Sequence, residues 1–310
     1  MAVVFIRIDK IGDLISTLSV DQHPQLQEDV TWVISPGLGI IPERAVPPRV
    51  FTELKDYKEL LALLRKIKPR AVVVFYAPWW VSLTCWMARV PLRVGRASQW
   101  HSFLFFNRRL RQTRSLSEKH ENDYNRELVE FGLSLKTAKI PQLMLKAEPN
   151  PQLLEKHGLT SEEYFVVHPG MFGSALNWPQ SKYNALIASL ITSGKVAVTG
   201  TNNDERFLNE VKLRWANHPQ VKILQGRLNM GELLSLLSTA KAVIAPSTGV
   251  LHMAAALGKK CVGIYSPILA HHPRRWGPLG PKASFLLPPD HQNMDLISVN
   301  SVLEELQRQP

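Results

Sequence analysis

The sequence predicts an α/β protein built from two doubly wound domains. The chain has 310 residues, of which 45% are hydrophobic and 20% are charged, a balance typical of a folded protein and not of a disordered one. This length fits two domains that each bury a core of their own. Apolar strand-like runs alternate with helix-like segments along both halves, which is the pattern of parallel sheets covered by helices.

The first half begins with a strand, a tight turn and a helix. Residues 2–8 are apolar and rich in Val and Ile, and residues 11–20 follow them with helix-like character. Further strands are predicted at residues 31–35 and 71–77, with a helix at 55–68 between them. The run AVVVFYA in the last of these strands is too apolar for a face in water, so it predicts the centre of a parallel sheet.

A domain boundary is predicted where the composition shifts. Residues 146–160, KAEPNPQLLEKHGLT, hold two prolines and a glycine between ordered-looking segments, so we assign residues 1–150 and 151–310 to separate domains. The C-terminal helix could pack back on the first domain. Parallel sheets bind ligands beyond the carboxyl ends of their strands, which predicts a reaction site in a central cleft that the two domains face. In the second half, strands are predicted at residues 164–168, 195–200, 221–224, 242–245 and 261–265.

Several features favour a cytoplasmic protein. Charged residues interrupt the first apolar run before the core of a signal peptide could form, and no uncharged apolar stretch approaches the roughly 18 residues of a membrane span. Cys85 and Cys261 lie far apart and match no metal-ligand spacing, so neither a disulfide framework nor a zinc site is expected.

The net charge of +11 is concentrated in the first domain. Eleven Lys and Arg residues, and no Asp or Glu, lie between Leu60 and Ser117. Cations interleaved with aromatic rings suit the surface of an anionic membrane, where each cation contributes about 1 kcal/mol. The alternative is a solvated basic face above ordinary core aromatics. The aromatic residues of this interval are Trp79, Trp80, Trp86, Trp100, Phe103, Phe105 and Phe106.

A nucleic-acid-binding protein would also be basic and would combine Arg with aromatic residues. Against this, the charge lies largely on one domain and no recognised nucleic-acid module occurs in the sequence. We therefore expect no nucleic-acid partner.

The first candidate site follows the first strand, where the chain reads RIDKIGD. Gly12 allows another group to approach the backbone closely. Asp13, in the first turn of the helix, is placed to take a proton from an incoming hydroxyl group. The alternative is that Asp13 only stabilises the start of the helix through its dipole.

The second candidate site is APSTGVLHMAAALG, residues 245–258, which follows a buried strand and opens a helix. Backbone amides around Ser247, Thr248 and Gly249 would form an anion site able to hold a diphosphate, with His252 in reach of the same anion. The alternative is an ordinary Ser or Thr N-cap before an alanine-rich packing helix.

Two loops of the second half complete the candidate donor site. The loop HPGMFGSALNWP, residues 168–179, leads into a helix predicted at residues 182–191, and its glycines and Ser174 suit a backbone close to phosphate. Its Asn-Trp-Pro end could equally start a helix around a buried indole. The turn GTNNDE, residues 200–205, ends a strand, where an acidic side chain could bind ribose hydroxyls.

Together these segments resemble glycosyltransferase family 9, the ADP-heptose:lipopolysaccharide heptosyltransferases. The resemblance covers nearly the whole chain and rests on IRIDKIGDLISTL, HPGMFGSALNWP, VAVTGTNNDE, APSTGVLHMAAALGKKCVGIYSP and RRWGPLG in the family's order. It implies a GT-B fold with two Rossmann-like domains, the first binding the acceptor and the second the nucleotide-sugar. It also implies that Asp13 is the general base and that Thr248, Gly249 and His252 form the phosphate-binding TG..H pattern.

The resemblance further implies an inverting transfer of a sugar, with ADP-heptose the expected donor, onto a phosphorylated lipopolysaccharide core acceptor. No Asp-x-Asp occurs in the sequence, so we expect an enzyme without a metal or other cofactor. The expected donor-binding residues are Gly170, Ser174, Asn177, Thr201, Asp204, Glu205, Ser247, Thr248, Gly249 and His252. The expected acceptor-binding residues are Lys10, Gly12, Arg65, Arg96, Arg108, Arg109 and Arg111.

Two positions depart from the family pattern. Many members carry an acidic residue where this chain has Ser247, and a Lys or Arg where it has Leu176. Without that cation, a charge-assisted contact to the diphosphate is lost unless Lys10 or Arg275 replaces it. The remaining alternatives are a GT-B relative with epimerase-like chemistry and a non-catalytic protein that binds nucleotide-sugars or anionic glycolipids.

Overall fold

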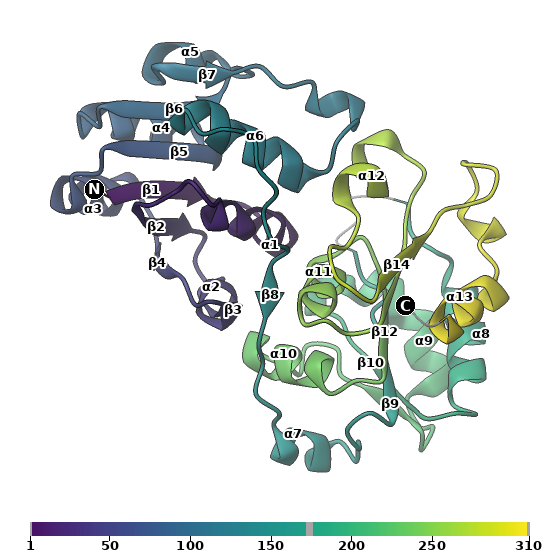
Figure 1. The fold of residues 1–310 in the computed structure, drawn as a ribbon. Helices are drawn as coiled ribbons and strands as arrows, with labels where there is room; N and C mark the ends of the chain where they lie inside the picture. Colours follow the sequence, from purple (N-terminus) through teal and green to yellow (C-terminus); the bar gives the residue numbers. More distant parts are fainter. Residues whose placement is uncertain (1, 172–175, 309–310) are drawn as a thin grey trace. The chain divides into compact units, whose positions relative to one another are not determined.

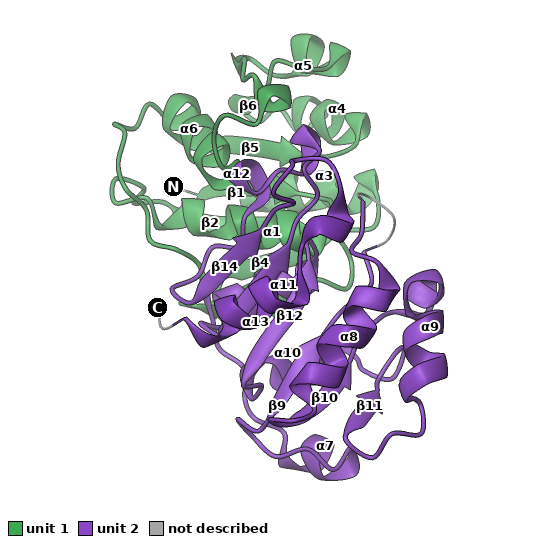
Figure 2. Ribbon diagram, turned by 90° about the vertical axis from the view of Figure 1, so that its right-hand side faces the viewer, with its two compact units in different colours: residues 1–143 green, residues 144–310 purple. Residues whose placement is uncertain are grey.

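The computed structural model describes residues 2–171 and 176–308. The chain divides into two compact units, unit 1 at Met1–Leu143 and unit 2 at Met144–Pro310 (Figure 2). The division falls a few residues before the boundary that the sequence predicts after residue 150. Each unit is an α/β structure with its own six-stranded parallel sheet.

The sheet of unit 1 has the strand order β4-β2-β1-β5-β6-β7, and every pair of neighbours is parallel (Figure 1). The three strands predicted from the sequence are confirmed as β1, β2 and β5. The other three carry charged or exposed residues that weaken the apolar signal. The strands are β1 (Ala2–Arg7), β2 (Asp29–Ile34), β4 (Val50–Glu53), β5 (Ala71–Tyr76), β6 (Leu92–Arg96) and β7 (Arg108–Leu110).

Helices cover both faces of this sheet. Leu60 and Val81 belong to a core cluster that packs α3 and α4 on one face, while Phe5, Trp32 and Phe75 form an aromatic cluster in the core. The helices are α1 (Ile11–Leu18), α2 (Ile40–Arg44), α3 (Tyr57–Ile67), α4 (Trp79–Met87), α5 (Trp100–Phe105) and α6 (Glu121–Leu133). Short 3₁₀ turns lie at Ser19–Gln22 and Arg114–Leu116, and a two-residue strand, β3, at Ala45–Val46.

The local sequence accounts for the ends of α3. The Asp56 carboxylate accepts hydrogen bonds from the amides of Lys58 and Glu59, which satisfies two donors of the first turn. Lys68 ends the helix in the left-handed conformation, with φ of 50°.

The sheet of unit 2 has the order β11-β10-β9-β12-β13-β14, again with all neighbours parallel. Its first, central strand is flanked by the second and fourth, as in unit 1, so both units have the 3-2-1-4-5-6 order of the Rossmann fold. The five strands predicted here are confirmed, and β14 is additional. The strands of this sheet are β9 (Tyr164–Val167), β10 (Lys195–Val198), β11 (Val221–Ile223), β12 (Ala242–Pro246), β13 (Cys261–Ile264) and β14 (Ala283–Leu286). The two-residue strand β8 (Met144–Leu145) is not part of it.

The core of unit 2 is built around Trp178 and Trp215, which pack with apolar residues of the sheet and of α8, α9 and α13. The C-terminal helix α13 packs against α8 and β13 of its own unit. The helices are α7 (Pro151–Lys156), α8 (Gln180–Leu190), α9 (Glu205–Trp215), α10 (Met230–Ser238), α11 (Gly249–Ala256), α12 (Pro273–Trp276) and α13 (Val299–Gln307), with 3₁₀ turns at Asn202–Asp204, Leu269–His271 and Met294–Leu296.

No helix within the described residues is both long and apolar enough to cross a bilayer.

Candidate active site

In unit 1, an ionic cluster lies at the carboxyl end of the central strand. The last residue of β1 is Arg7, whose side chain is only 3% exposed. Asp9 lies in the turn that follows, and Asp13 lies in the first turn of α1. This is the edge at which doubly wound sheets bind their ligands.

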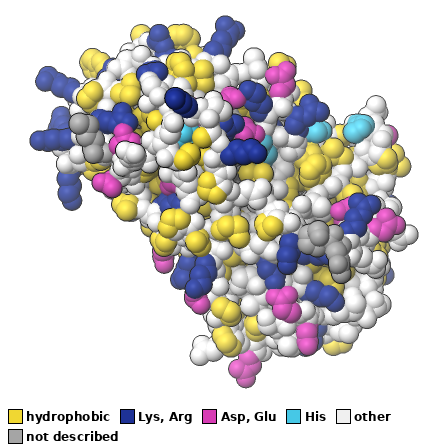
Figure 3. Space-filling model, viewed as in Figure 1, with side chains coloured by type: hydrophobic (Ala, Val, Ile, Leu, Met, Phe, Trp, Pro, Cys, Tyr) yellow, Lys and Arg dark blue, Asp and Glu magenta, His cyan; other side chains and the backbone are white. Residues whose placement is uncertain are grey.

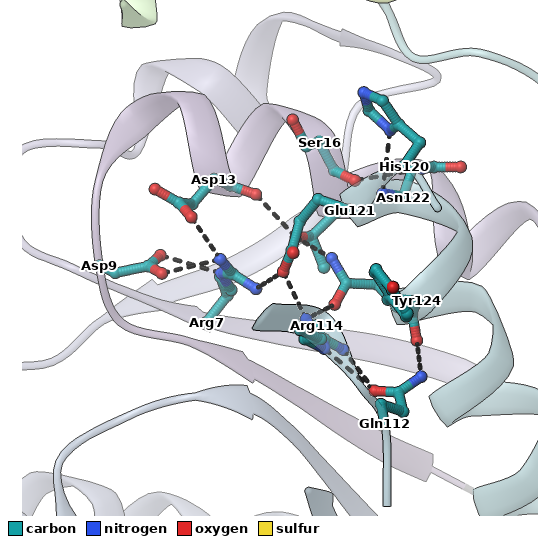
Figure 4. A network of polar contacts seen from close by, with 12 residues as sticks. Arg7, Asp9, Asp13, Ser16, Gln112, Arg114, His120, Glu121, Asn122 and Tyr124 are labelled. Atoms are coloured by element: carbon teal, nitrogen blue, oxygen red, sulfur yellow. Dashed lines mark hydrogen bonds and ion pairs between the residues drawn. The ribbon is translucent and has the colours of Figure 1, made fainter. Parts of the chain in front are cut away.

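One guanidinium joins three carboxylates in this cluster (Figure 4). Arg7 Nη2 donates to Asp13 Oδ1 at 2.6 Å, and Arg7 Nε donates to Asp9 Oδ1 at 3.0 Å. Arg7 Nη1 reaches Glu121 Oε1 at 3.3 Å from the opposite side. Glu121 is the first residue of α6 and is 1% exposed. The position of Asp13 therefore depends on a residue more than a hundred positions away in sequence.

A second arginine continues the network. Arg114 pairs with Glu121 and donates to Asn125 Oδ1 at 3.1 Å. Asn125 in turn donates to Thr17 Oγ1 at 2.9 Å, and Thr17 Oγ1 donates to the backbone carbonyl of Asp13 at 2.7 Å. The chain of contacts thus returns to α1 at the backbone of Asp13, while the Asp13 carboxylate itself is held by Arg7.

Burial sets the protonation of the two carboxylates beside Arg7. Desolvation raises the pKa of Asp9 to about 7, although the positive charge of Arg7 opposes the shift. Desolvation also raises the pKa of Asp13; Arg7 and Lys10 lower it, while Glu121 raises it further. Asp13 keeps 21% of its side chain exposed, so solvent or a substrate can reach it. A reachable carboxylate with raised proton affinity is suited to general-base chemistry near neutral pH.

Sequence reasoning found Asp13 but missed the residues that hold it. In the sequence, Arg7 is only a charge that interrupts an apolar run, and Arg114 is only one of the eleven cations between Leu60 and Ser117. Glu121 was not singled out. The usable signal was Arg7 itself, because a charge at the end of a wholly buried strand needs partners.

In unit 2, the start of α11 lies at the carboxyl end of β12, beside the central strand. Thr248 is the N-cap, with extended backbone at φ −136° and ψ 166°, but its side chain makes no capping hydrogen bond. Its Oγ1 is buried and has no hydrogen-bond partner in the described part of the chain. An ordinary Thr N-cap would bond the amide two or three residues on, so the ordinary-cap alternative does not describe this position.

The neighbours of Thr248 at the start of α11 are Ser247, Gly249 and, in the first turn, His252. Gly249 is the first residue of the helix, where amides have no acceptor within the helix. His252 is in the first turn and is 5% exposed, and its amide donates to the Thr248 carbonyl at 3.3 Å. Ser247 shares a side-chain hydrogen bond with Tyr265, which follows β13.

His168 follows the central strand β9 at the same edge. Its Nδ1 lies 3.0 Å from Thr199 Oγ1, and burial lowers the pKa of the imidazole to about 4, with Asp204 opposing the shift. The ring is therefore neutral at neutral pH.

The turn after β10 was predicted to bind ribose hydroxyls through an acidic side chain, but its buried carboxylate bonds to the turn itself. The Asp204 carboxylate is 2% exposed and accepts hydrogen bonds from Thr201, at 2.8 Å from the amide and 2.7 Å from Oγ1. Gly170 lies so close that a Cβ there would be 2.3 Å from Asp204 Cγ. Asp204 and Thr201 thus stabilise the turn itself, and this structure does not present the Asp204 carboxylate to a ribose. Glu205 is exposed and pairs with Lys212 at 2.7 Å.

The loop between β9 and α8 is held by its own side chains. Asn177 Nδ2 donates to the Pro169 carbonyl at 2.7 Å, and its Oδ1 accepts from the Trp178 amide at 2.9 Å. Trp178 is buried and donates to the Ile297 carbonyl at 3.0 Å, which confirms the buried indole. Leu176 is 48% exposed. Ser174, a predicted donor ligand, lies outside the described residues.

Most of the predicted acceptor-binding residues share the carboxyl edge or the β7 side of unit 1. Lys10 is exposed at the N-cap of α1, two residues before Gly12 in the first turn of that helix. Arg96, at the end of β6, stacks 5.5 Å from the ring centroid of Tyr76. On or after β7, Arg108 lies over Phe131 and Arg109 over Phe103, and Arg111 is exposed.

Arg65 is the exception and corrects the prediction. It lies in the last turn of α3 and lines a cavity with Ala2, the first residue of β1. A six-residue strand is about 20 Å long, so Arg65 is at the opposite edge of the sheet from Arg7 and Asp13. It cannot share a site with the Asp13 carboxylate.

Metal-binding groups were also sought. Among residues 2–171 and 176–308, no three His, Cys, Asp or Glu side chains are grouped so as to hold a metal ion.

The two units thus share a Rossmann-like strand order, with a partly exposed carboxylate at the carboxyl edge of one sheet and the start of a helix at that edge of the other, and solved structures show the same fold. A solved structure of Escherichia coli ADP-heptose lipopolysaccharide heptosyltransferase II superposes with a TM-score of 0.83 over 99% of this chain and 97% of that one, at 21% identity. The E. coli heptosyltransferase WaaC with ADP gives 0.72 at 18% identity, covering 98% of each chain.

The chain belongs to glycosyltransferase family 9 (heptosyltransferase), whose sequence profile matches residues 61–305. A putative glycosyltransferase of Haemophilus influenzae is 28% identical over 270 residues, which are 81% of this chain and 77% of that protein. The E. coli lipopolysaccharide heptosyltransferase 2 is 29% identical over 132 residues, or 41% of this chain and 38% of its own. These findings confirm the family and the enzyme class that the sequence motifs indicated.

Proposed function

We propose that this glycosyltransferase moves a heptose from ADP-heptose onto a lipopolysaccharide core acceptor, with inversion and without a metal. The observation that carries the proposal is Asp13: a partly exposed carboxylate of raised pKa, held on a buried arginine at the carboxyl end of a Rossmann-like sheet. Support for the sugar comes from relatives named lipopolysaccharide heptosyltransferase and from the solved E. coli WaaC complex with ADP-2-deoxy-2-fluoro heptose.

In the proposed step, the Asp13 carboxylate takes the proton of an acceptor hydroxyl as its oxygen attacks the anomeric carbon. The bond from that carbon to the diphosphate oxygen breaks on the opposite face, and its electron pair leaves with the nucleoside diphosphate. Arg7 orients the carboxylate through the 2.6 Å contact. Asp9 pairs with the same Arg7 guanidinium. When the Asp9 carboxyl is protonated, it adds no negative charge beside Asp13.

The donor diphosphate would bind at the start of α11. Free amides of a first helical turn and the helix dipole both favour an anion, and charge that grows on the leaving group is stabilised there. The buried Thr248 hydroxyl supplies a donor that no described protein group uses. Ser247, Gly249 and His252 complete this subsite, with Gly170 and Asn177 in the adjoining loop. Glu205 is the exposed carboxylate of the ribose region.

Metal independence rests on two features. The sequence lacks the Asp-x-Asp pair, and the start of α11 offers hydrogen-bond donors for the charge that a cation would otherwise neutralise. One solved neighbour, TibC of enterotoxigenic E. coli, is described as an iron-containing glycosyltransferase; it superposes with a TM-score of 0.56 at 15% identity, covering 99% of this chain and 76% of its own.

The acceptor and the membrane would both meet unit 1. Lys10, Arg96, Arg108, Arg109 and Arg111 supply cations for a phosphorylated glycolipid. Helices α4 and α5 pack together and expose large apolar side chains at the surface, which suits a peripheral position at the inner face of an anionic membrane. These side chains are Trp79, Trp86, Trp100, Phe103 and Leu104, each more than half exposed.

The test combines binding and transfer. ADP-, UDP-, GDP- and dTDP-sugars are compared by thermal shift, where a ligand of the folded state raises the melting temperature. ADP-heptose should give the largest shift, and purified core glycolipid should then gain one heptose by mass spectrometry, with the anomeric configuration inverted by NMR. The rate should be unchanged in EDTA. Binding without transfer would indicate a non-catalytic protein, and a rearranged free sugar would indicate epimerase-like chemistry.

A further inference from the structure

Unit 1 contains a second concavity that the proposed reaction does not use. It has a volume of about 680 Å³, within the range of small-molecule sites, and lies at the amino-terminal edge of the sheet. Its lining comes from the start of β1, the end of α3, the segment before β5, and the segment between α4 and β6. The Asp13 carboxylate is at the other edge of the same sheet.

The inner surface of this cavity is apolar. Its apolar floor is formed by the partly exposed Ile67 and Ala88 and by the exposed Pro91, while Leu64 and Val90 are almost fully buried, at 1% and 2% exposed. Such a surface favours hydrocarbon over water, at roughly 25 cal/mol for each Å² covered.

The rim of the cavity is cationic. Arg65, Lys68 and Arg89 are exposed and line it, and none has an ion-pair partner among the described residues. Arg70 also lines it and pairs with Glu28. No acidic residue lies among the lining groups. Like charges around an apolar floor repel one another, so an anion that reaches the rim is bound favourably.

Two of these cations occupy backbone positions where a long side chain is unusual. Lys68 has φ of 50° and Arg89 has φ of 54°, in the left-handed region that favours Gly or Asn. Each follows the end of a helix, where the dipole favours a positive charge. Lys68 and Arg89 therefore both place a positive charge at the rim of the same cavity.

The surroundings extend the apolar character to the surface. Helix α4 ends in Trp86 and Met87, which are 52% and 42% exposed and directly precede the cavity segment. Lys and Arg side chains gather on the edge of unit 1 that carries α3 and the N-terminus, at the left of Figure 3. An apolar floor, a cationic rim and exposed rings beside it together suit an amphiphilic anion.

We propose that this cavity binds an anionic lipid, with an acyl chain on the floor of Ile67, Ala88 and Pro91 and a phosphate headgroup between Arg65, Lys68 and Arg89. The site goes beyond the proposed transfer reaction and does not depend on it. Bound lipid would hold unit 1 to an anionic bilayer by the edge that does not carry Asp13.

The probe is dodecyl phosphate, titrated below its critical micelle concentration into the full chain by isothermal calorimetry. The test variant combines Arg65→Gln, Lys68→Asn and Arg89→Asn, because Asn tolerates the left-handed backbone and the fold should be kept. The control variant removes three exposed lysines of unit 1 that do not line the cavity, Lys58→Gln, Lys66→Gln and Lys136→Gln.

We expect the test variant to bind dodecyl phosphate at least tenfold more weakly than the wild type, and the control variant to stay within twofold. Melting temperatures should show that both variants are folded. Vesicles containing phosphatidylglycerol should no longer bind the test variant but should still bind the control variant. Equal binding of inorganic phosphate would mean a free-anion site and overturn the lipid assignment. Equal binding of dodecyl maltoside, or equal loss in both variants, would overturn it as well.

Discussion

The two units share a strand order but differ in how they handle charge at the same place in the fold. In unit 1, the end of the central strand carries Arg7, and the buried groups around it are ionic. In unit 2, the end of the central strand carries His168, which burial keeps neutral, and the nearest helix offers amides and an unbonded hydroxyl. The topology places both groups of residues at the carboxyl ends of the strands, and the side chains after the strands decide whether the buried groups there are charged or neutral.

The difference also predicts opposite responses to disruption. An ionic cluster resists removal of any one member, because the remaining charges stay buried without compensation. A neutral site of amides loses little stability when one polar group is removed, but it loses affinity for its ligand. The four predictions below test this contrast.

The largest effect is expected from Asp13→Asn, which removes the proposed base. The rate of transfer should fall by about 10³-fold, within the range for loss of a general base. The matched control is Asp123→Asn, since Asp123 is also the third residue of its helix and so shares any effect of the helix dipole. Initial rates at saturating substrates measure the effect. Equal losses in both variants would reduce Asp13 to a helix-start carboxylate.

The next effect concerns stability. Glu121→Gln removes the fully buried carboxylate between Arg7 and Arg114, and should lower the free energy of unfolding by about 3 kcal/mol. Glu127→Gln is the control, because its pair with Lys119 is exposed and should be worth under about 1 kcal/mol. Urea titration of both variants measures the difference. A loss below 1 kcal/mol for Glu121→Gln would show that the cluster tolerates an unbalanced charge.

The units should respond to pH in opposite directions. Asp9 has a pKa raised to about 7, so the folded state binds its proton more tightly than the unfolded state does, and this stabilisation is lost as pH rises from about 4 to 7. His168 has a pKa lowered to about 4, so its contribution is present above about 6.5 and is lost as pH falls towards 4.

Each slope is at most about 1.4 kcal/mol per pH unit. Relative to Asp9→Asn, the wild type should lose stability as pH rises; relative to His168→Asn, it should gain. Urea unfolding at half-unit steps from pH 4 to 7 measures both. Parallel slopes for the two variants would contradict the contrast between the units.

The smallest effect is expected from Thr248→Val. The hydroxyl has no protein partner in the described chain, so its loss should leave the melting temperature unchanged or slightly raised. Loss of one hydrogen bond to a charged diphosphate should weaken ADP binding by about tenfold, as measured by calorimetry. Thr192→Val, an exposed threonine at the end of α8, should change neither quantity. A drop in stability without a change in affinity would assign Thr248 a purely structural role.

Much of the fold was predictable because its signals are local. The runs that became β1, β5, β9 and β12 are buried apart from single residues at their ends, so hydrophobicity alone marked them. Strands β6 and β7 were not predicted, because LRVGR and RRL carry arginines that weaken the apolar pattern. Their strand conformation depends on pairing with the neighbouring strands. The Asp13 and Thr248 segments stood out in the sequence because each lies between a strand and a helix, where a short motif is informative; their roles stay predictions.

By itself the sequence determined the α/β class, the two-domain plan, the positions of the main strands along the chain and the family, because these follow from periodicity and from contiguous motifs. Only the tertiary structure decided that Arg7 and Glu121 hold Asp13, that Asp204 is bound to its own turn, and that Arg65 lies at the far edge of the sheet. The physical reason is that the energy of a buried charge depends on groups brought near it in space, and separation along the chain carries no information about that distance.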